Sequence, residues 1–158
     1  MINTPECLLR IYEGQDEMPE DLRFSFENER ELSIKPLPKD RVDPEHWNSF
    51  FVCAETSAKE VIGGVCIDVG PLNYGSMQHG KMGFLEYVFV HADHRGKGIG
   101  EKLIRRAMEE ARNRRCQFIR CEADLSNAAE MALYRKCGFA LAETGQGSEC
   151  LAVKPLNT

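Results

Sequence analysis

The sequence lacks long hydrophobic runs and any excess of positive charge. Its 158 residues carry 25 acidic and 20 basic side chains, a net charge of -5, whereas nucleic-acid-binding domains usually present a basic face. No apolar run approaches the roughly 20 residues of a membrane span, and the start MINTPECLLRIYEGQDE has neither the basic flank nor the apolar stretch of a signal peptide. We therefore expect a cytoplasmic protein with no nucleic-acid or membrane partner, and cationic small molecules as the easier ligands.

Cysteine is present, but its pattern is not that of a disulfide framework. The seven cysteines are an odd number scattered through expected strands and helices, which is typical of reduced thiols. Cys116 and Cys121 lie an odd number of residues apart on one expected strand, so we expect them to face opposite sides, which argues against a joint zinc site. His91 and His94 have no acidic or thiol partner clustered with them. The sequence therefore predicts no metal.

Repeats, low-complexity linkers and composition breaks are also absent, so we expect a single domain over residues 1–158. Apolar patterns predict strands at 7–13, 50–56, 61–70, 84–90, 116–124, 139–144 and 149–156. They predict helices beginning near Pro19, at 44–49, at 98–115 and at 126–139. Asn127 and Glu130 are spaced like a capping box, Gly138 is placed as a helix terminator, and residues 70–81 are expected to form a long glycine-rich loop.

Three glycines at alternate positions, Gly96, Gly98 and Gly100, open the helix that follows the strand FLEYVFV. Each weakens a first helical turn by roughly 1 kcal/mol relative to alanine. A strand that turns directly into a helix points several backbone N–H groups and the positive end of the helix dipole at one spot, which attracts phosphate. Side chains there would block a diphosphate from those amides, and Arg95 and Lys97 add positive charge.

Two familiar phosphate-binding loops do not fit this stretch. The P-loop requires a terminal Gly-Lys-Ser/Thr, which is missing. The dinucleotide fingerprint G-x-G-x-x-G has a different glycine spacing and ordinarily follows the first strand of its unit.

The stretch R-x-x-G-x-G at 95–100, the strand LEYVFVHADH before it and the later NAAEMALYRKCGF together resemble the GNAT superfamily of acetyl-CoA-dependent N-acetyltransferases. The resemblance covers about residues 50–155; the first 49 residues match only in the order of elements. It implies an α/β (α+β) fold, with a mixed, mostly antiparallel central sheet flanked by helices on both faces. It also implies acetyl-CoA as co-substrate, bound by Val88, Phe89, Val90, Arg95, Gly96, Lys97, Gly98, Ile99, Gly100, Asn127 and Tyr134. Ala92 stands where the family often has proline.

The implied reaction needs a base, because an alkyl amine has a pKa of about 10 and arrives protonated at neutral pH. Glu86 lies in an otherwise apolar strand and shares the parity of Phe84, Val88 and Val90, so we expect it on one face with them. We interpret Glu86 as the base, acting directly or through water; an outward-facing charge is the alternative. Resembling enzymes stabilise the oxyanion with a backbone N–H near Val90.

The resemblance also assigns roles to the last helix. Tyr134 matches a family tyrosine whose phenol donates to the leaving thiolate, although a core tyrosine is the alternative. Asn127 matches a residue that contacts the pantetheine arm, and it is also placed to cap the helix. Arg135 and Lys136 either meet the adenosine 3′-phosphate or complement the helix dipole.

The acceptor is the least determined part. GFLEYVFV resembles the corresponding strand of aminoglycoside N-acetyltransferases, and residues 13–31 hold eight acidic side chains against two arginines. In resembling proteins this region borders the acceptor side, so we favour a small polycationic amine; an acidic helix face turned to water is the alternative. A catalytically silent acetyl-CoA-binding sensor and a protein N-terminal or lysine acetyltransferase also remain open. A homodimer is one option for the assembly.

Overall fold

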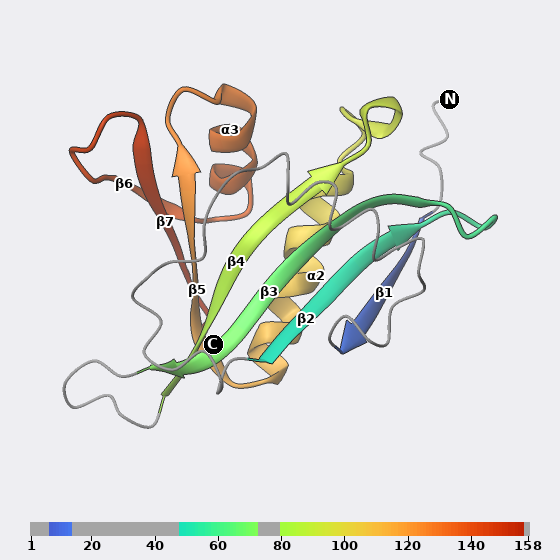
Figure 1. Ribbon diagram of the computed structural model, residues 1–158, viewed down its shortest axis with the longest axis horizontal. Helices are drawn as coiled ribbons and strands as arrows, with labels where there is room; N and C mark the ends of the chain where they lie inside the picture. Colours follow the sequence, from blue (N-terminus) through green and yellow to red (C-terminus); the bar gives the residue numbers. More distant parts are fainter. Residues whose placement is uncertain (1–6, 14–47, 73–79, 157–158) are drawn as a thin grey trace.

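The computed structural model describes residues 7–13, 48–72 and 80–156, which form one sheet and the helices packed against it (Figure 1). The strands are β1 (Leu8–Glu13), β2 (Asn48–Glu55), β3 (Val61–Leu72), β4 (Gly80–Val90), β5 (Cys116–Asp124), β6 (Ala140–Glu143) and β7 (Glu149–Pro155). The helices are α2 (Ile99–Asn113) and α3 (Ala128–Lys136), with a 3-10 turn, η3 (Ala92–His94), before α2.

The seven described strands lie in the order β1-β2-β3-β4-β5-β7-β6. β4 and β5 run parallel, whereas the other neighbouring pairs are antiparallel. The parallel pair is joined through α2, because a parallel connection needs a crossover and not a tight turn. The prediction of a mixed, mostly antiparallel sheet is thus confirmed.

One continuous core lies between the sheet and both described helices. α2 contributes its apolar stripe at a spacing of three to four residues, Ile99, Leu103, Ile104, Ala107, Met108 and Ala111, and α3 contributes Met131 and Tyr134. These side chains meet Val52, Val65 and Ile119 of the sheet. Both described helices therefore pack on the same face. The helix expected near Pro19 and residues 44–47 of the next one lie outside the described residues.

The opposite face carries a smaller apolar cluster of Phe51, Cys53, Cys66 and Phe89. Among the described residues, neither helix combines the length and the apolar character needed to cross a membrane.

The positions at which β2, β3 and β4 begin or end differ from two local predictions. β3 continues to Leu72 and β4 begins at Gly80, with Leu72 opposite Gly80. All the described residues of the expected 70–81 loop therefore belong to the two strands of a hairpin. Asn48 and Ser49, expected to end a helix, instead begin β2 and pair with Val69 and Asp68.

Three register shifts interrupt the alternation of side chains in the described strands, one between β2 and β3 at Ala54/Glu55 and two that bear on the candidate site. In β4, Cys66 pairs with Tyr87 and Ile67 with Leu85, which leaves Glu86 as the extra residue. In β5, the pairing passes from Cys116 to Phe118 across consecutive residues of β4, so that Gln117 is extra. Because each bulge shifts the alternation by one residue, Cys116 and Cys121 both lie in the main core. The prediction that they face opposite sides was wrong.

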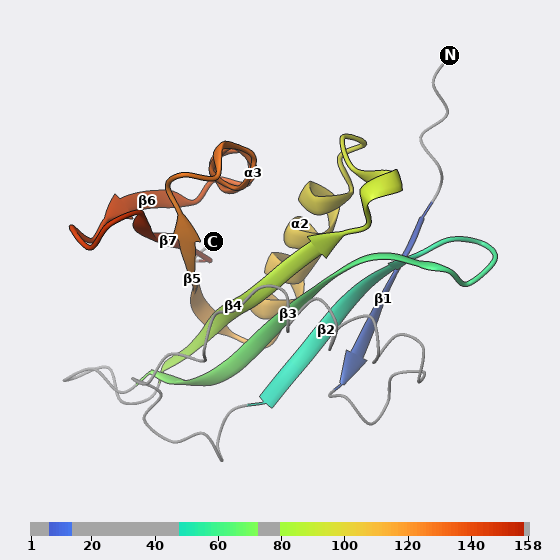
Figure 2. The ribbon, with the colours of Figure 1, turned by 45° about the horizontal axis from the view of Figure 1, so that its top comes forward.

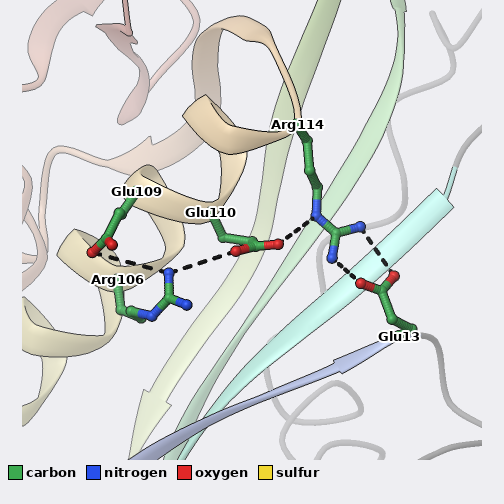
Figure 3. Close-up of polar contacts among 5 residues, drawn as sticks. All are labelled: Glu13, Arg106, Glu109, Glu110 and Arg114. Atoms are coloured by element: carbon green, nitrogen blue, oxygen red, sulfur yellow. Dashed lines mark hydrogen bonds and ion pairs between the residues drawn. The ribbon is translucent and has the colours of Figure 1, made fainter.

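Arg114 joins the carboxyl end of α2 to the first strand (Figure 3). Its guanidinium donates to Glu110 Oε1 at 3.1 Å and to both carboxylate oxygens of Glu13 on β1. It also stacks over the ring of Phe50, 4.4 Å from the centroid. One side chain thus holds β1, β2 and α2 together.

Candidate active site

β4 and β5 begin side by side and then separate (Figures 1 and 2). They pair only where Lys81–Phe84 of β4 meets Cys116–Arg120 of β5. Beyond that point β4 continues to Val90 and remains paired with β3, while β5 remains paired with β7. Within the described part of the chain, the β5 side of β4 from Leu85 to Val90 therefore has no strand partner.

The main chain of this edge points its polar groups toward the opening. The His91 N–H donates to the Ile62 carbonyl at 2.9 Å, so His91 faces β3. Since alternate residues of an antiparallel strand turn their N–H and C=O groups to opposite sides, those of Val88 and Val90 point to the β5 side. An extended ligand with amide groups can pair with such an edge.

The glycine loop lies at the end of this edge. After η3, Gly96 and Gly98 adopt left-handed φ angles of 79° and 80°, and α2 begins at Ile99 with Gly98 as its N-cap. The N-cap position of α2 makes no side-chain capping bond, and the first helical amides have no acceptor within a helix. The loop thus presents amides and the positive end of a 15-residue helix beside the open strand edge.

Glycine is needed at the three positions for different structural reasons. At Gly96 and Gly98 an added Cβ would meet nothing within 4 Å, so the left-handed backbone requires glycine and the space above it is open. At Gly100 a Cβ would lie 3.3 Å from Leu133 Cδ2 of α3. The sequence argument attributed all three to diphosphate approach, whereas at Gly100 the structure gives a packing reason.

The charged residues of the loop are exposed, and one is tied to the strand. Arg95 Nε donates to the Val90 carbonyl at 2.8 Å, which fixes the start of the loop against the end of β4. Lys97 is exposed. Ile99 is buried in the core, so its main-chain amide, and not its side chain, faces the loop.

Glu86 lies at the β4 bulge, and its side chain is half-buried. Cys66 Sγ lies 3.4 Å from Glu86 Oε2, and Cys66 belongs to the apolar cluster on the face away from α2. Val88 and Val90 pack against the main core on the α2 face. The prediction that Glu86 shares a face with these two valines was therefore wrong. Glu86 is itself the extra residue of the bulge, so the alternation of side chains along β4 shifts by one residue there.

Sequence reasoning missed the neighbours of Glu86. Asp68 on β3 is 2% exposed, and it accepts a hydrogen bond from the Ser49 hydroxyl on β2. The Cys66 sulfur and one carboxylate oxygen each of Asp68 and Glu86 lie within 4.8 Å of one another. The available signal was an aspartate inside the apolar run VIGGVCIDVG, which is uncommon unless the charge has a partner.

Tyr134 is buried on α3, 3% exposed, with its ring centroid 5.3 Å from that of Phe139. Its phenol is hydrogen-bonded to the Cys121 thiol of β5. Burial, the nearby Cys121 and Glu130, and that hydrogen bond raise the pKa of the phenol well above its usual value. Tyr134 therefore keeps its proton throughout the neutral and mildly alkaline range.

The start of α3 is capped as expected. Asn127 Oδ1 accepts from the Glu130 N–H at 3.0 Å, and Gly138 takes the left-handed conformation beyond the helix. At the other end, Arg105 of α2 donates to the Lys136 carbonyl at 2.8 Å, and Lys136 Nζ lies 3.7 Å from a Glu101 oxygen. These contacts tie α3 to the first turns of α2.

The separated β4–β5 pair and the helix beside it, which has no side-chain cap, form a site that can accommodate an extended, phosphorylated ligand. The chain matches the model of the acetyltransferase (GNAT) family over residues 11–139 and belongs to that family. This confirms the resemblance drawn from the glycine stretch.

Individual curated relatives match only part of the chain. Glucosamine 6-phosphate N-acetyltransferase 1 of Oryza sativa subsp. japonica is 42% identical over 62 residues, 38% of this chain and 34% of that protein. Streptothricin acetyltransferase of Escherichia coli is 30% identical over 112 residues, 69% of this chain and 59% of that protein. The chain thus spans between 34% and 59% of the length of these two relatives.

The fold is shared with solved structures. The crystal structure of Arabidopsis thaliana NAA60 in complex with acetyl-CoA superposes with a TM-score of 0.64 at 16% identity, covering 94% of this chain and 99% of that one. At this identity the likeness is one of fold.

Proposed function

We propose that this protein transfers an acetyl group from acetyl-CoA to a primary amine of a small, cationic acceptor by direct attack. The observation that carries the proposal is the continuity of the open β4 edge, which leads from Glu86 to the uncapped amides of α2. A base near the start of the open edge of β4 and a phosphate-binding loop beyond its end suit a long nucleotide thioester whose reactive end lies far from its phosphates.

The residues present fit acetyl-CoA. The amides from Gly96 to Gly100 suit the diphosphate, since the space above Gly96 and Gly98 is open and no side chain caps the described start of α2. The main chain at Val88 and Val90 suits the amide-containing pantetheine arm, whereas that of Phe89, also expected there, faces β3. The relative solved with acetyl-CoA supports this assignment. When bound, acetyl-CoA supplies the activated acetyl group and the leaving thiolate.

Three groups of the protein then act on the reacting atoms. Glu86 accepts a proton from the ammonium of the acceptor, directly or through water, so that the free amine can attack. The Val90 N–H, turned to the β5 side, donates to the carbonyl oxygen as it gains negative charge. Tyr134, whose raised pKa keeps its proton in place, donates a hydrogen bond to the departing sulfur.

The acceptor class follows from weaker observations. The two relatives described above are named for small acceptors, streptothricin and glucosamine 6-phosphate, which supports a small-molecule amine. The cationic preference rests on the acidic region 13–31, of which only Glu13 is described. Glu13 is held by Arg114, so its charge contributes less to attracting an amine than the sequence alone indicates.

Salt dependence tests the cationic preference. Steering between exposed charges is screened over about 8 Å at physiological ionic strength, so KM for a polyamine should rise with salt more than KM for a neutral monoamine. An equal response of both would mean that the acidic region only faces water.

The base is tested by Glu86→Gln. The variant should lose rate chiefly at neutral pH and recover part of it at high pH, where free amine accumulates. A variant with the wild-type rate and pH profile would place the base elsewhere. Acetylation of a peptide amino terminus, with none of a small-amine panel modified, would instead favour the protein acetyltransferase alternative.

A further inference from the structure

We propose that Cys121 of β5 is a positioning residue for Tyr134: its sulfur holds the phenolic hydroxyl at the point where β4 and β5 separate, until the sulfur of coenzyme A takes its place. The inference rests on the proposed function for its catalytic consequence. The contact between the two side chains is a property of the free protein.

Cys121 lies where the sheet opens. Arg120 and Phe84 are the last described pair between β5 and β4, so Cys121 is the first residue of β5 beyond that pairing, and it remains paired with Ala152 of β7. Its side chain belongs to the main core, on the face that carries α2 and α3. The proposed base, Glu86, follows Phe84 by two residues on β4. A group held by Cys121 is therefore at the same end of the open edge as the base.

The ring of Tyr134 is fixed in place by its surroundings. It belongs to α3, which packs against β5 (Figures 1 and 2). Its centroid lies 5.3 Å from that of the Phe139 ring, and the Tyr134 carbonyl accepts from the Phe139 N–H at 3.0 Å. With the ring held, the direction of the hydroxyl hydrogen depends on its partner, because a hydroxyl rotates to suit its acceptor.

That partner is a sulfur atom. The Tyr134 hydroxyl is hydrogen-bonded to the Cys121 thiol, and the two residues are 3% and 1% exposed. A buried hydroxyl is costly without a hydrogen-bond partner, but a thiol is only a weak donor and a weak acceptor. Cys121 therefore satisfies the hydroxyl in the free protein without binding it strongly.

The departing thiolate is a stronger partner for the same hydroxyl. Attack by the amine breaks the carbon–sulfur bond of the thioester, and the electron pair leaves on the coenzyme A sulfur. Hydrogen bonds to an ionised acceptor are roughly twice as strong as those between neutral groups, so the hydroxyl turns from the Cys121 sulfur to the charged one. The phenol, whose pKa is raised, keeps its proton in this exchange. Only its hydrogen-bond partner changes.

The contact is tested by ¹³C NMR of the tyrosine Cζ atoms in the full-length protein. The chain has four tyrosines, and the Tyr134 signal is assigned from its loss in Tyr134→Phe. Cys121→Ala and Cys121→Ser should each move that signal in the free protein. Cys150→Ala, the same change at another fully buried cysteine of the main core, should leave it in place. A signal that neither Cys121 substitution moves would overturn the proposal.

The exchange of partners is tested by adding ligands to the wild type at about pH 9.5, where most of a free thiol is ionised. Coenzyme A should move the Tyr134 signal, and the analogue of coenzyme A that lacks the sulfur atom should move it much less. Equal shifts with the two ligands would mean that the hydroxyl does not turn to the coenzyme A sulfur, and would overturn the proposal.

The catalytic consequence is tested by a double-mutant cycle. Cys121→Ser supplies a hydroxyl, a stronger partner that retains the Tyr134 hydroxyl, so kcat should fall about three- to tenfold. In a Tyr134→Phe background the same change should leave kcat where Tyr134→Phe alone puts it. Acetyl-CoA affinity should hardly change in these variants. An equal fold-reduction in both backgrounds would assign Cys121 a merely structural role and overturn the proposal. Absence of turnover in the wild type would contradict the proposed function, whereas the NMR results would still decide the contact and the exchange.

Discussion

Arg95 Nε donates a 2.8 Å hydrogen bond to the main-chain carbonyl of Val90. The first side chain of the glycine loop is therefore fastened to the end of the strand that precedes it. This links the two parts of the candidate site, the open edge of β4 and the amides of α2.

Arg95→Met should weaken acetyl-CoA binding about five- to tenfold, because it removes both the tie to Val90 and a charge beside the phosphates, and an exposed charged hydrogen bond contributes about 1 kcal/mol. Lys97→Met removes a charge from the same loop without that tie, so its loss should be smaller. Isothermal titration of both variants measures the difference. Equal losses would mean that charge alone matters here.

Substitutions at Gly98 distinguish two requirements of the loop: a left-handed backbone and open space for the ligand. Gly98→Val should reduce acetyl-CoA affinity well over tenfold, and a β-branched residue at its φ of 80° should also cost about 1–2 kcal/mol of stability. Gly98→Asn tolerates the left-handed backbone better but still places a side chain in the open space, so it should lose affinity with less loss of stability.

The matched control is Gly145→Val. Gly145 has a φ of 81° and equally open surroundings, in the turn between β6 and β7. It should be destabilised like Gly98→Val without loss of affinity. Wild-type affinity in both Gly98 variants would remove the phosphate-loop argument.

Tyr134→Phe deletes only the phenolic hydroxyl. We expect kcat to fall by a factor of about 10 to 1,000 with little change in acetyl-CoA affinity. Because the pKa of the buried phenol is raised above its usual value, its proton is retained as pH rises from 7 to about 10. The fold-reduction should therefore be constant over that interval. Tyr12→Phe, in which the hydroxyl lost faces Glu55, should keep the wild-type kcat. A reduction that disappears between pH 7 and 10 would contradict the assignment.

Arg114 should matter for stability and not for chemistry. Arg114→Met removes a partly buried guanidinium that bonds Glu13 and Glu110 and stacks on Phe50, so we expect a loss of about 1–2 kcal/mol. Arg106→Met removes longer ion pairs of 3.6 and 4.0 Å to residues of α2 itself, and Arg106 joins no other element through them, so the loss should be smaller. Urea unfolding of both variants measures the difference. Equal losses in the free energy of unfolding would mean that Arg114 does not hold β1, β2 and α2 together.

The elements that sequence reasoning predicted well are those fixed by local patterns. The strand at 116–124 matches β5 in full, and the helix at 98–115 matches α2 to within two residues at its carboxyl end. The Asn127 cap and the Gly138 terminator depend on residues within one or two turns of each other, so they too could be predicted.

The features that it missed depend on pairing between strands. Nothing within GFLEYVFV specifies that Glu86 is an extra residue; the bulge is visible only in the pairing of β4 with β3. For the same reason the parity argument failed at Glu86 and at Cys116. Asp68 and Ser49 lie 19 residues apart and meet only because β2 and β3 form a hairpin.

The most direct test of the account is to follow an isotopically labelled acetyl group from acetyl-CoA onto an amine. The protein would be incubated with labelled acetyl-CoA and a polyamine, and the products would be analysed by mass spectrometry alongside the release of the coenzyme A thiol. Six of the seven cysteines are buried, and Cys7 is half-buried, so the protein's own thiols should add little to the signal. The account predicts one labelled amide per thiol released. Tight binding of acetyl-CoA with no labelled product on any amine would contradict it, and would indicate a protein that holds the thioester without turning it over.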